Sequence, residues 1–183
     1  MIGTLAMRAA ADGRPAVIVT GDKDFFQLVD DEKGIRVFNP RDDGAWYDAE
    51  GVKTKFGVTP GQVVDVLALM GDSIDNIKGV PGIGEKGARE LITTHGTLDA
   101  LLEHAPALSG KKRELLTTHA DSARESRTLL RIRTDVPLPD VDMSCFTYRG
   151  ANRQKCFELF SSLGFRSLVT EYAPTADTVD ADY

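Results

Sequence analysis

The stretch from Gly71 to Leu91, which reads GDSIDNIKGVPGIGEKGAREL, constrains this chain more strongly than its other segments. Its centre, Gly79 to Gly84, is too rich in glycine for a helix or a strand interior, but it lets the backbone approach a partner closely. A helical pattern begins near Glu85, and the start of a helix offers unpaired N–H groups and a positive dipole end to an anion. Lys86 and Arg89 add positive charge there. The segment therefore predicts a backbone cradle for phosphate.

Two pairs of aspartates accompany this cradle. Asp72 and Asp75 lie within one turn of backbone immediately before it, and Asp22 and Asp24 follow the short apolar run 15–20. That run is typical of a strand buried on both faces in a parallel sheet, and open α/β sheets place their ligand crevice at the carboxyl ends of such strands. A hard cation such as Mg²⁺ prefers oxygen ligands, and a two-metal site draws carboxylates from several loops. Carboxylates beside a phosphate cradle suggest phosphodiester chemistry.

Each of these features also has a simpler interpretation. Asp22 and Asp24 could solvate a turn or cap a helix that starts at Phe25, and Asp72 could be an N-cap. The glycine segment could be a helix–helix turn without a ligand. The metal interpretation is favoured because each aspartate pair ends a buried apolar segment.

Composition leaves nucleic acid open as a partner. The chain has 183 residues, 42% of them hydrophobic and 27% charged, which is ordinary for a globular domain. The net charge of −6 is unevenly distributed. Residues 22–50 carry nine acidic and four basic side chains, whereas residues 111–133 carry seven basic and three acidic ones. The basic side chains are Lys111, Lys112, Arg113, Arg124, Arg127, Arg131 and Arg133, which form either a phosphate-binding surface or a solvated helical face.

The expected order of elements is α/β at first and helical afterwards. We predict an Ala-rich helix at 1–11, strands at 15–20, 35–38 and 45–47, and a helical segment at 25–29. Helices follow at 49–56, from Thr59 onwards, and at 85–95, 98–104, 111–119, from 121 and 151–163, with an extended segment at 132–138. Residues 174–183 are acidic and without periodicity, which indicates a tail or linker. No apolar run is long enough for a membrane helix, the N-terminus lacks a signal-peptide pattern, and two cysteines are too few for a disulfide framework. A cytoplasmic location is therefore expected.

The motifs GDKDFFQLV, GDSIDNIKGVPGIGEK and ESRTLLRIRTDVPL together resemble the 5′–3′ exonuclease domain of bacterial DNA polymerase I, in the flap endonuclease family. The similarity runs to about Leu168. It implies a PIN-like parallel-sheet core with a helix-hairpin-helix DNA-binding subdomain. It also implies that Asp22, Asp24, Asp72 and Asp75 hold two Mg²⁺ or Mn²⁺ ions and perform catalysis.

The resemblance further implies how DNA is held. Its hairpin binds duplex DNA through the segment that here includes Gly79, Val80, Gly82, Ile83, Gly84, Lys86 and Arg89, commonly around a monovalent cation such as K⁺. We expect residues 1–58 to form a partial α/β core, 59–134 the hairpin subdomain, 135–172 a return to the core, and 173–183 an acidic tail or a linker to a polymerase domain.

The sequence departs from the family pattern in a few places. Ile74, Lys78 and Gly87 stand where the family usually has serine, proline and threonine. The family also precedes the first helix with an acidic element and a strand that carries an essential aspartate. Met1 follows directly after the place of that acidic element, so we expect a chain truncated at its N-terminus.

The sequence therefore predicts a metal-dependent 5′–3′ exonuclease and flap endonuclease that acts on duplex, flapped or nicked DNA and is inactive or weak in this form. One alternative is a non-catalytic, structure-specific DNA-binding module that uses the hairpin and the basic helices. Another is a metal-dependent phosphohydrolase for a small molecule, which leaves the hairpin unexplained.

Overall fold

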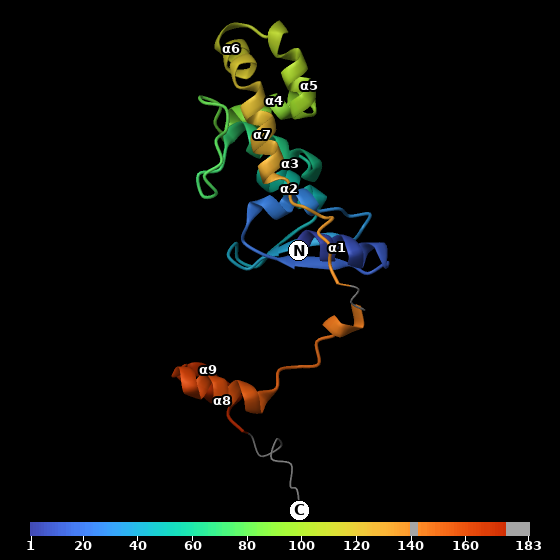
Figure 1. Ribbon diagram of the computed structural model, residues 1–183, viewed down its shortest axis with the longest axis vertical. Helices are drawn as coiled ribbons and strands as arrows, with labels where there is room; N and C mark the ends of the chain where they lie inside the picture. The colour runs from blue at the N-terminus through green and yellow to red at the C-terminus, as the bar shows by residue number, and fades with distance from the viewer. Residues whose placement is uncertain (140–142, 175–183) are drawn as a thin grey trace, which may run out of the picture. The chain divides into compact units, whose positions relative to one another are not determined.

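A computed structural model describes residues 1–139 and 143–174, and it divides after Pro139 into two compact units (Figure 1). The first unit carries all of the predicted site residues. The predicted acidic tail, apart from its first two residues, lies outside the described residues. None of the helices in the described ranges has the length and apolar character needed to cross a membrane.

The sheet of the first unit has three strands, β1 (Ala16–Val19), β2 (Ile35–Asn39) and β3 (Ala45–Tyr47), in that order. β1 and β2 are parallel, with Ile18 opposite Val37, and β3 is antiparallel to β2. The parallel pairing that the apolar run predicts is therefore present. The expected burial of both faces is wrong, because Val17 is 48% and Val19 is 65% exposed while Ile18 faces the core. A continuous apolar run does not reveal whether anything covers its second face.

Two short elements flank this sheet. Helix α1 (Ile2–Ala11) lies beside it and buries small residues at Gly3, Ala6 and Ala9. After β1 the chain forms η1 (Lys23–Leu28), a 3-10 helix where an ordinary helix was expected. The reason is local, because Asp22 accepts a hydrogen bond from the amide of Asp24 and winds the first turn tightly. Phe26 of η1 then packs on Tyr47 and Phe56 in the core.

The rest of the first unit is helical, as predicted. Helix α3 is buried along nearly its whole length and packs against α4 and α7. One hydrophobic core extends from the sheet through α3 into the later helices, so the sheet and the helical part belong to a single unit. The elements are α2 (Ala49–Phe56), η2 (Pro60–Gln62), α3 (Val63–Met70), α4 (Glu85–His95), α5 (Leu98–His104), η3 (Ala105–Ala107), α6 (Gly110–Thr118) and α7 (Ala120–Leu130).

The second unit contains η4 (Met143–Phe146), α8 (Arg153–Leu163) and α9 (Arg166–Tyr172). The two helices pack through Phe160, whose ring centroid lies 6.2 Å from that of Phe165 and 5.5 Å from that of Tyr172. Gly164, in the left-handed conformation, ends α8, as the sequence predicts. The expected return of residues 135–172 to the core stays a prediction, as do the boundaries proposed at residues 58 and 134.

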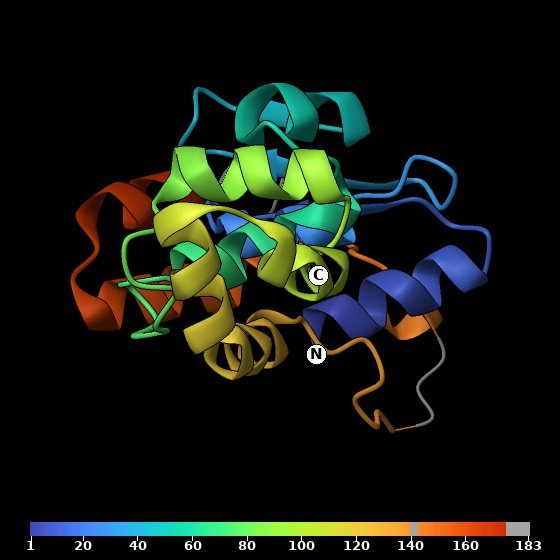
Figure 2. The same ribbon diagram turned by 90° about the horizontal axis from the view of Figure 1, so that it is seen from above.

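The segment after α7 is tied to the N-terminal helix. It is extended, as predicted, and it passes the beginning of α1 in both ribbon views (Figures 1 and 2). The amide of Val136 donates a hydrogen bond to Oγ1 of Thr4. A Cβ atom added to Gly3 would lie 2.8 Å from Cγ2 of Ile132 and 3.1 Å from the carbonyl oxygen of Arg133. Glycine at position 3 therefore permits this close approach.

Candidate metal and nucleic-acid site

The loop that carries Asp72 and Asp75 is closed by two glycines at its base. The amide of Asp72 donates to the carbonyl of Ile77, and the amide of Ile77 donates back to Asp72. A Cβ atom on Gly71 would lie 2.5 Å from the backbone nitrogen of Gly79, and one on Gly79 would lie 2.3 Å from that of Gly71. Backbone meets backbone here without room for a side chain. Gly79, which was predicted to bind DNA, therefore has a structural role at this neck.

Asp72 is the buried member of its pair. One of its carboxylate oxygens accepts a hydrogen bond from the amide of Ile74 at 2.8 Å, and the other lies 2.7 Å from Nζ of Lys23. The hydrogen bond from Lys23 holds the pKa of Asp72 below its usual value. Lys23 belongs to the GDKD motif, so this ion pair joins the two motifs that carry the aspartates. Asp75 is exposed on the same loop.

Asp22 and Asp24 lie at the carboxyl end of β1, where the sequence predicts a ligand crevice. Oδ1 of Asp22 accepts the amide of Asp24 at 2.9 Å, so the N-cap interpretation of Asp22 is correct for this contact. Oδ1 of Asp24 is buried and makes no hydrogen bond to the described part of the chain. A capping role thus accounts for one oxygen of Asp22 and leaves Asp24 unexplained.

A hollow of about 630 Å³ brings the two loops together. It is formed where the ends of the parallel strands β1 and β2 meet the aspartate loop after α3. This is the edge of the sheet at which α/β folds bind ligands. Its lining residues are Val19, Thr20, Gly21, Asp22, Lys23, Pro40, Arg41, Asp72, Ile74 and Asp75.

The other three aspartates all lie within electrostatic reach of Asp24. Burial and, after it, the negative charges of Asp22, Asp72 and Asp75 together raise the pKa of Asp24 to about 6. A buried carboxylate oxygen without a partner, surrounded by other carboxylates, fits a hard divalent cation such as Mg²⁺ or Mn²⁺. The residues present therefore fit the metal that the resemblance implies.

The side chains are not arranged as a finished cage. Within residues 1–139 and 143–174, no three acidic, histidine or cysteine side chains converge closely enough to hold a metal ion as they stand. The ammonium of Lys23 takes up an oxygen of Asp72 that a metal would use. Cation binding would therefore compete with this ion pair.

Only some backbone amides of the glycine hairpin between α3 and α4 are left for the predicted phosphate cradle, because others bond within the described part of the protein. The amide of Val80 donates to the carbonyl of Leu69 at 2.7 Å, and that of Ile83 donates to Val80 at 3.0 Å. Both side chains are buried. In the described ranges the amides of Gly82 and Gly84 make no such bond, and no side chain caps α4, which begins at Glu85. The cradle is thus formed by these two glycines and the first turn of α4.

The two predicted cationic side chains beside the cradle differ in their surroundings. Lys86 is exposed and borders a hollow of about 460 Å³ with Lys111 and Lys112 from the start of α6. Arg89 is half-buried, forms an ion pair with Glu85, and places its guanidinium carbon 5.1 Å from the ring centroid of Phe56. Lys86 is free to meet a phosphate, whereas Arg89 has a packing role and its contact with DNA stays a prediction.

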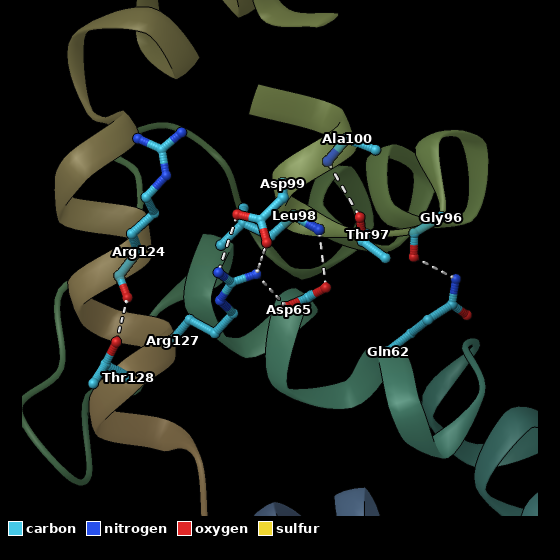
Figure 3. A network of polar contacts seen from close by, with 10 residues as sticks. All are labelled: Gln62, Asp65, Gly96, Thr97, Leu98, Asp99, Ala100, Arg124, Arg127 and Thr128. Carbon is cyan, nitrogen blue, oxygen red and sulfur yellow. Dashed lines mark hydrogen bonds and ion pairs between the residues drawn. The ribbon is translucent and has the colours of Figure 1, made fainter. Parts of the chain in front are cut away.

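The basic residues of α7 are also of two kinds. Arg127 forms two hydrogen bonds with Asp99, at 2.9 and 3.0 Å, and lies 3.7 Å from the buried Asp65 of α3 (Figure 3). Asp65 in turn accepts the amide of Leu98 and so caps α5 from another helix. The interpretation of Arg127 as a phosphate-binding or solvated side chain is wrong, because its guanidinium is committed to two carboxylates. Arg124 forms an ion pair with the exposed Asp121.

Sequence reasoning missed three polar residues that organise this region. Asp65 interrupts an otherwise apolar helix, and Ser126 occupies the buried stripe of α7 between Ala123 and Leu130. Gln27 lies beside the metal motif and bonds to the end of α7. A polar residue at a position where helical periodicity requires an apolar one is the signal for Asp65 and Ser126. Gln27 has no such signal, because two of its three backbone partners, Leu130 and Ile132, lie about a hundred residues away.

Comparison with protein families agrees with the geometry. A model described as "5'-3' exonuclease, C-terminal SAM fold" matches residues 58–154, more than half of the chain, and one described as "5'-3' exonuclease, N-terminal resolvase-like domain" matches residues 1–57. The chain belongs to the 5′-3′ exonuclease family. The resemblance inferred from the three motifs is thereby confirmed.

Relatives within this family are similar over most of the chain. DNA polymerase I of Bacillus subtilis is 39% identical over 184 residues, which is 100% of this chain and 21% of that protein. DNA polymerase I of Pseudomonas aeruginosa is 42% identical over 175 residues, 91% of this chain and 19% of that protein. The chain thus spans about a fifth of the length of these relatives.

Solved structures show the same fold. The bacteriophage T5 5′-exonuclease with bound zinc ions superposes with a TM-score of 0.61 and 23% identity, covering 70% of this chain and 48% of that one. A T5 flap endonuclease in complex with DNA and metal ions gives the same TM-score and coverage at 22% identity. The expected fold class, an α/β core with a helical subdomain, is confirmed.

Proposed function

We propose that this chain carries the metal-dependent hydrolysis of DNA phosphodiesters, as a 5′–3′ exonuclease and flap endonuclease. The observation that supports it best is the common hollow of two aspartate-bearing loops, one of which leads directly into the uncapped start of α4. Carboxylates for a cation and amides for a phosphate therefore lie on one continuous segment, residues 72–87.

Each group has a role in this proposal. Asp22, Asp24, Asp72 and Asp75 would hold divalent metal, and the buried oxygen of Asp24, which makes no hydrogen bond in the described part of the chain, would be available as a ligand. Two bound Mg²⁺ or Mn²⁺ ions supply Lewis acidity that favours in-line attack of water on the phosphodiester. Lys23, which is paired with Asp72 in the metal-free site, would supply positive charge near a bound phosphate.

DNA is held away from the carboxylates. The amides of Gly82, Gly84 and the first turn of α4 bind the sugar-phosphate backbone, with Lys86, Lys111 and Lys112 beside them. Carbonyls of the same hairpin are the proposed place for K⁺. These contacts carry no base identity, so the proposed substrate is chosen by its structure, a duplex with a 5′ flap or nick.

The test is cleavage of a labelled 5′-flap duplex in Mg²⁺. Asp22→Asn and Asp75→Asn should each lower turnover at least a hundredfold while leaving binding of the duplex in EDTA unchanged. Asp12→Asn removes the same charge from an exposed turn at the end of α1 and serves as the matched control. If all three variants cleave like the parent, the aspartates are not the metal site.

A non-catalytic DNA-binding module is the second candidate. The ion pair of Lys23 with Asp72 favours it, because the lysine ammonium already neutralises the buried carboxylate of the loop. For the same reason we propose that this chain cleaves weakly. Binding of flap DNA in EDTA without any Mg²⁺-stimulated cleavage would support the module. Turnover like that of an active 5′-3′ exonuclease of the same family would contradict the proposal of weak activity.

A further inference from the structure

We propose that Gln27 and Ser126 are positioning residues that fasten the two aspartate-bearing loops to helix α7 and so set the spacing between them. The inference rests on the proposed function, because a fixed spacing matters only if the two loops share a ligand. It concerns residues that never touch the metal or DNA themselves.

Gln27 uses its whole side-chain amide on backbone groups. Its Nε2 donates to the carbonyl of Asp24 at 2.9 Å and to that of Leu130 at 3.0 Å. Its Oε1 accepts the amide of Ile132 at 3.0 Å. One side chain thus joins the metal motif after β1 to the last residue of α7 and to Ile132, two residues farther along the chain. Any movement of the Asp24 backbone relative to α7 would break at least one of these bonds.

Ser126 fastens the other loop to the same helix. It lies on the buried face of α7, only 4% exposed, and its hydroxyl donates to the carbonyl of Lys78. Lys78 precedes Gly79 at the neck of the loop that carries Asp72 and Asp75. The two hydrogen-bonded positions, residues 126 and 130, lie about one helical turn apart on α7. Both aspartate-bearing loops are therefore attached to the same helix.

Helix α7 is itself held firmly. Arg127, between these two positions, bonds to Asp99 of α5 and lies near Asp65 of α3 (Figure 3). The segment after α7 is held against α1 by the bond from Val136 to Thr4. Helix α7 and the segment after it are thus both fixed by contacts with other helices. A precise metal site requires such support, because residues that orient the ligands must themselves have fixed positions.

The neutral character of these bonds is the reason to assign them a functional role. The ion pair of Lys23 with Asp72 also joins the two loops, but a divalent cation competes with it. The bonds of Gln27 and Ser126 go to backbone carbonyls and amides, which a metal at the carboxylates does not displace. They are therefore the contacts that can keep the spacing in both the metal-free and the metal-bound protein.

The experiment compares Gln27→Leu and Ser126→Ala with two controls that lose the same kind of bond elsewhere. Gln62→Leu removes a glutamine bond to the carbonyl of Gly96, and Thr128→Ala removes a hydroxyl bond to the carbonyl of Arg124 within α7. Three quantities are measured: backbone amide shifts by NMR without metal, Mn²⁺ affinity by electron paramagnetic resonance, and kcat and KM on a 5′-flap duplex.

We expect Gln27→Leu to shift the amides of Asp22 and Asp24, and Ser126→Ala to shift those of Asp72 and Asp75. Each should weaken Mn²⁺ binding about tenfold to a hundredfold, as loss of an outer-shell partner does. kcat should fall with KM for DNA unchanged, because the hairpin keeps its contacts. Ser126→Thr, which keeps the hydroxyl, should restore most of the affinity.

Two outcomes overturn the inference. One is that the amides of the aspartates shift no more in Gln27→Leu and Ser126→Ala than in the controls. The other is that both variants bind Mn²⁺ with an affinity within twofold of the parent. The proposed function fails separately. If the parent neither binds Mn²⁺ nor cleaves DNA, there is no metal nuclease, and the NMR shifts alone then decide whether Gln27 and Ser126 position the loops.

Discussion

Nζ of Lys23 lies 2.7 Å from Oδ2 of Asp72, so the motif after β1 supplies a cation to the innermost carboxylate of the loop after α3. The side chain of Asp72 is only 4% exposed, and an unpaired charge there would be costly. The lysine therefore stabilises the site in the absence of metal and opposes the binding of metal. Both effects come from one contact.

We predict that Lys23→Met binds Mn²⁺ about fivefold to tenfold more tightly than the parent, since a charge pair at this distance contributes about 1 kcal/mol even in a water-like environment. The same variant should be less stable without metal, because Asp72 loses its partner. Titration of free Mn²⁺ by electron paramagnetic resonance measures the first effect and urea unfolding in EDTA the second. Lys33→Met, which breaks the exposed pair with Asp30, is the control. Weaker Mn²⁺ binding by Lys23→Met would show that the lysine organises the ligands instead.

Whereas Lys23→Met should destabilise the metal-free protein, a substitution of Asp24 should stabilise it. Burial and three neighbouring carboxylates raise its pKa from 3.8 to about 6 in the folded protein. The folded state therefore binds more protons than the unfolded state between these values, and the metal-free protein loses stability as pH rises from about 4 to 6. Asp24→Asn should stabilise the metal-free protein at pH 7 by about 1 to 2 kcal/mol, a value reduced for solvent screening.

The measurement is urea unfolding of the parent and Asp24→Asn in EDTA at pH 7 and pH 4. The gain should become much smaller at pH 4, where Asp24 is protonated in the folded parent and nearly half protonated in the unfolded chain. Mn²⁺ should stabilise the parent and not the variant. A variant that is less stable than the parent at pH 7 would show that Asp24 is not under electrostatic strain.

Two glycines of the hairpin should affect different properties when they are substituted: Gly79 the stability of the fold, and Gly84 the binding of DNA. A Cβ atom at Gly79 would meet backbone atoms of Gly71, Leu69 and Met70 at 2.3 to 2.4 Å, whereas one at Gly84 has no neighbour within 4 Å. Gly79→Ala should therefore lower the free energy of unfolding by about 1 to 3 kcal/mol or more and open the neck of the aspartate loop. Gly84→Ala should leave stability unchanged and weaken duplex binding, because the new methyl group stands in the phosphate cradle. Equal stability of the two variants would contradict the close approach of the backbone at Gly79.

Much of the fold could be predicted from the sequence because its signals are local. The apolar run before Asp22 and the glycine that ends α8 each act within a few residues. The α/β beginning and helical continuation followed from them. What failed depends on distant partners, such as the open second face of β1, which an apolar run alone cannot reveal.

The candidate site divides in the same way. The two aspartate pairs were visible as motifs, and the sheet topology explains why they meet at one edge. The partners of Gln27 and Ser126 could not be foreseen, because they are backbone carbonyls and an amide that only the tertiary fold brings close. Arg127 was misread for a related reason, since a basic residue on a helix looks the same in sequence whether it faces solvent or a buried acid.

Arg127 supports the last prediction. Its guanidinium neutralises the buried Asp65, so Arg127→Leu leaves an uncompensated buried charge and should lower the free energy of unfolding by about 3 kcal/mol. Arg124→Leu breaks only an exposed pair with Asp121 and should cost less than about 1 kcal/mol. Urea unfolding at pH 7 compares the two. The double variant Asp65→Asn with Arg127→Leu should recover part of the loss, because asparagine keeps an acceptor for the amide of Leu98 without the charge. Duplex affinity measured against salt should have the same slope in Arg127→Leu as in the parent, and a slope reduced by about one would instead place this guanidinium on a phosphate.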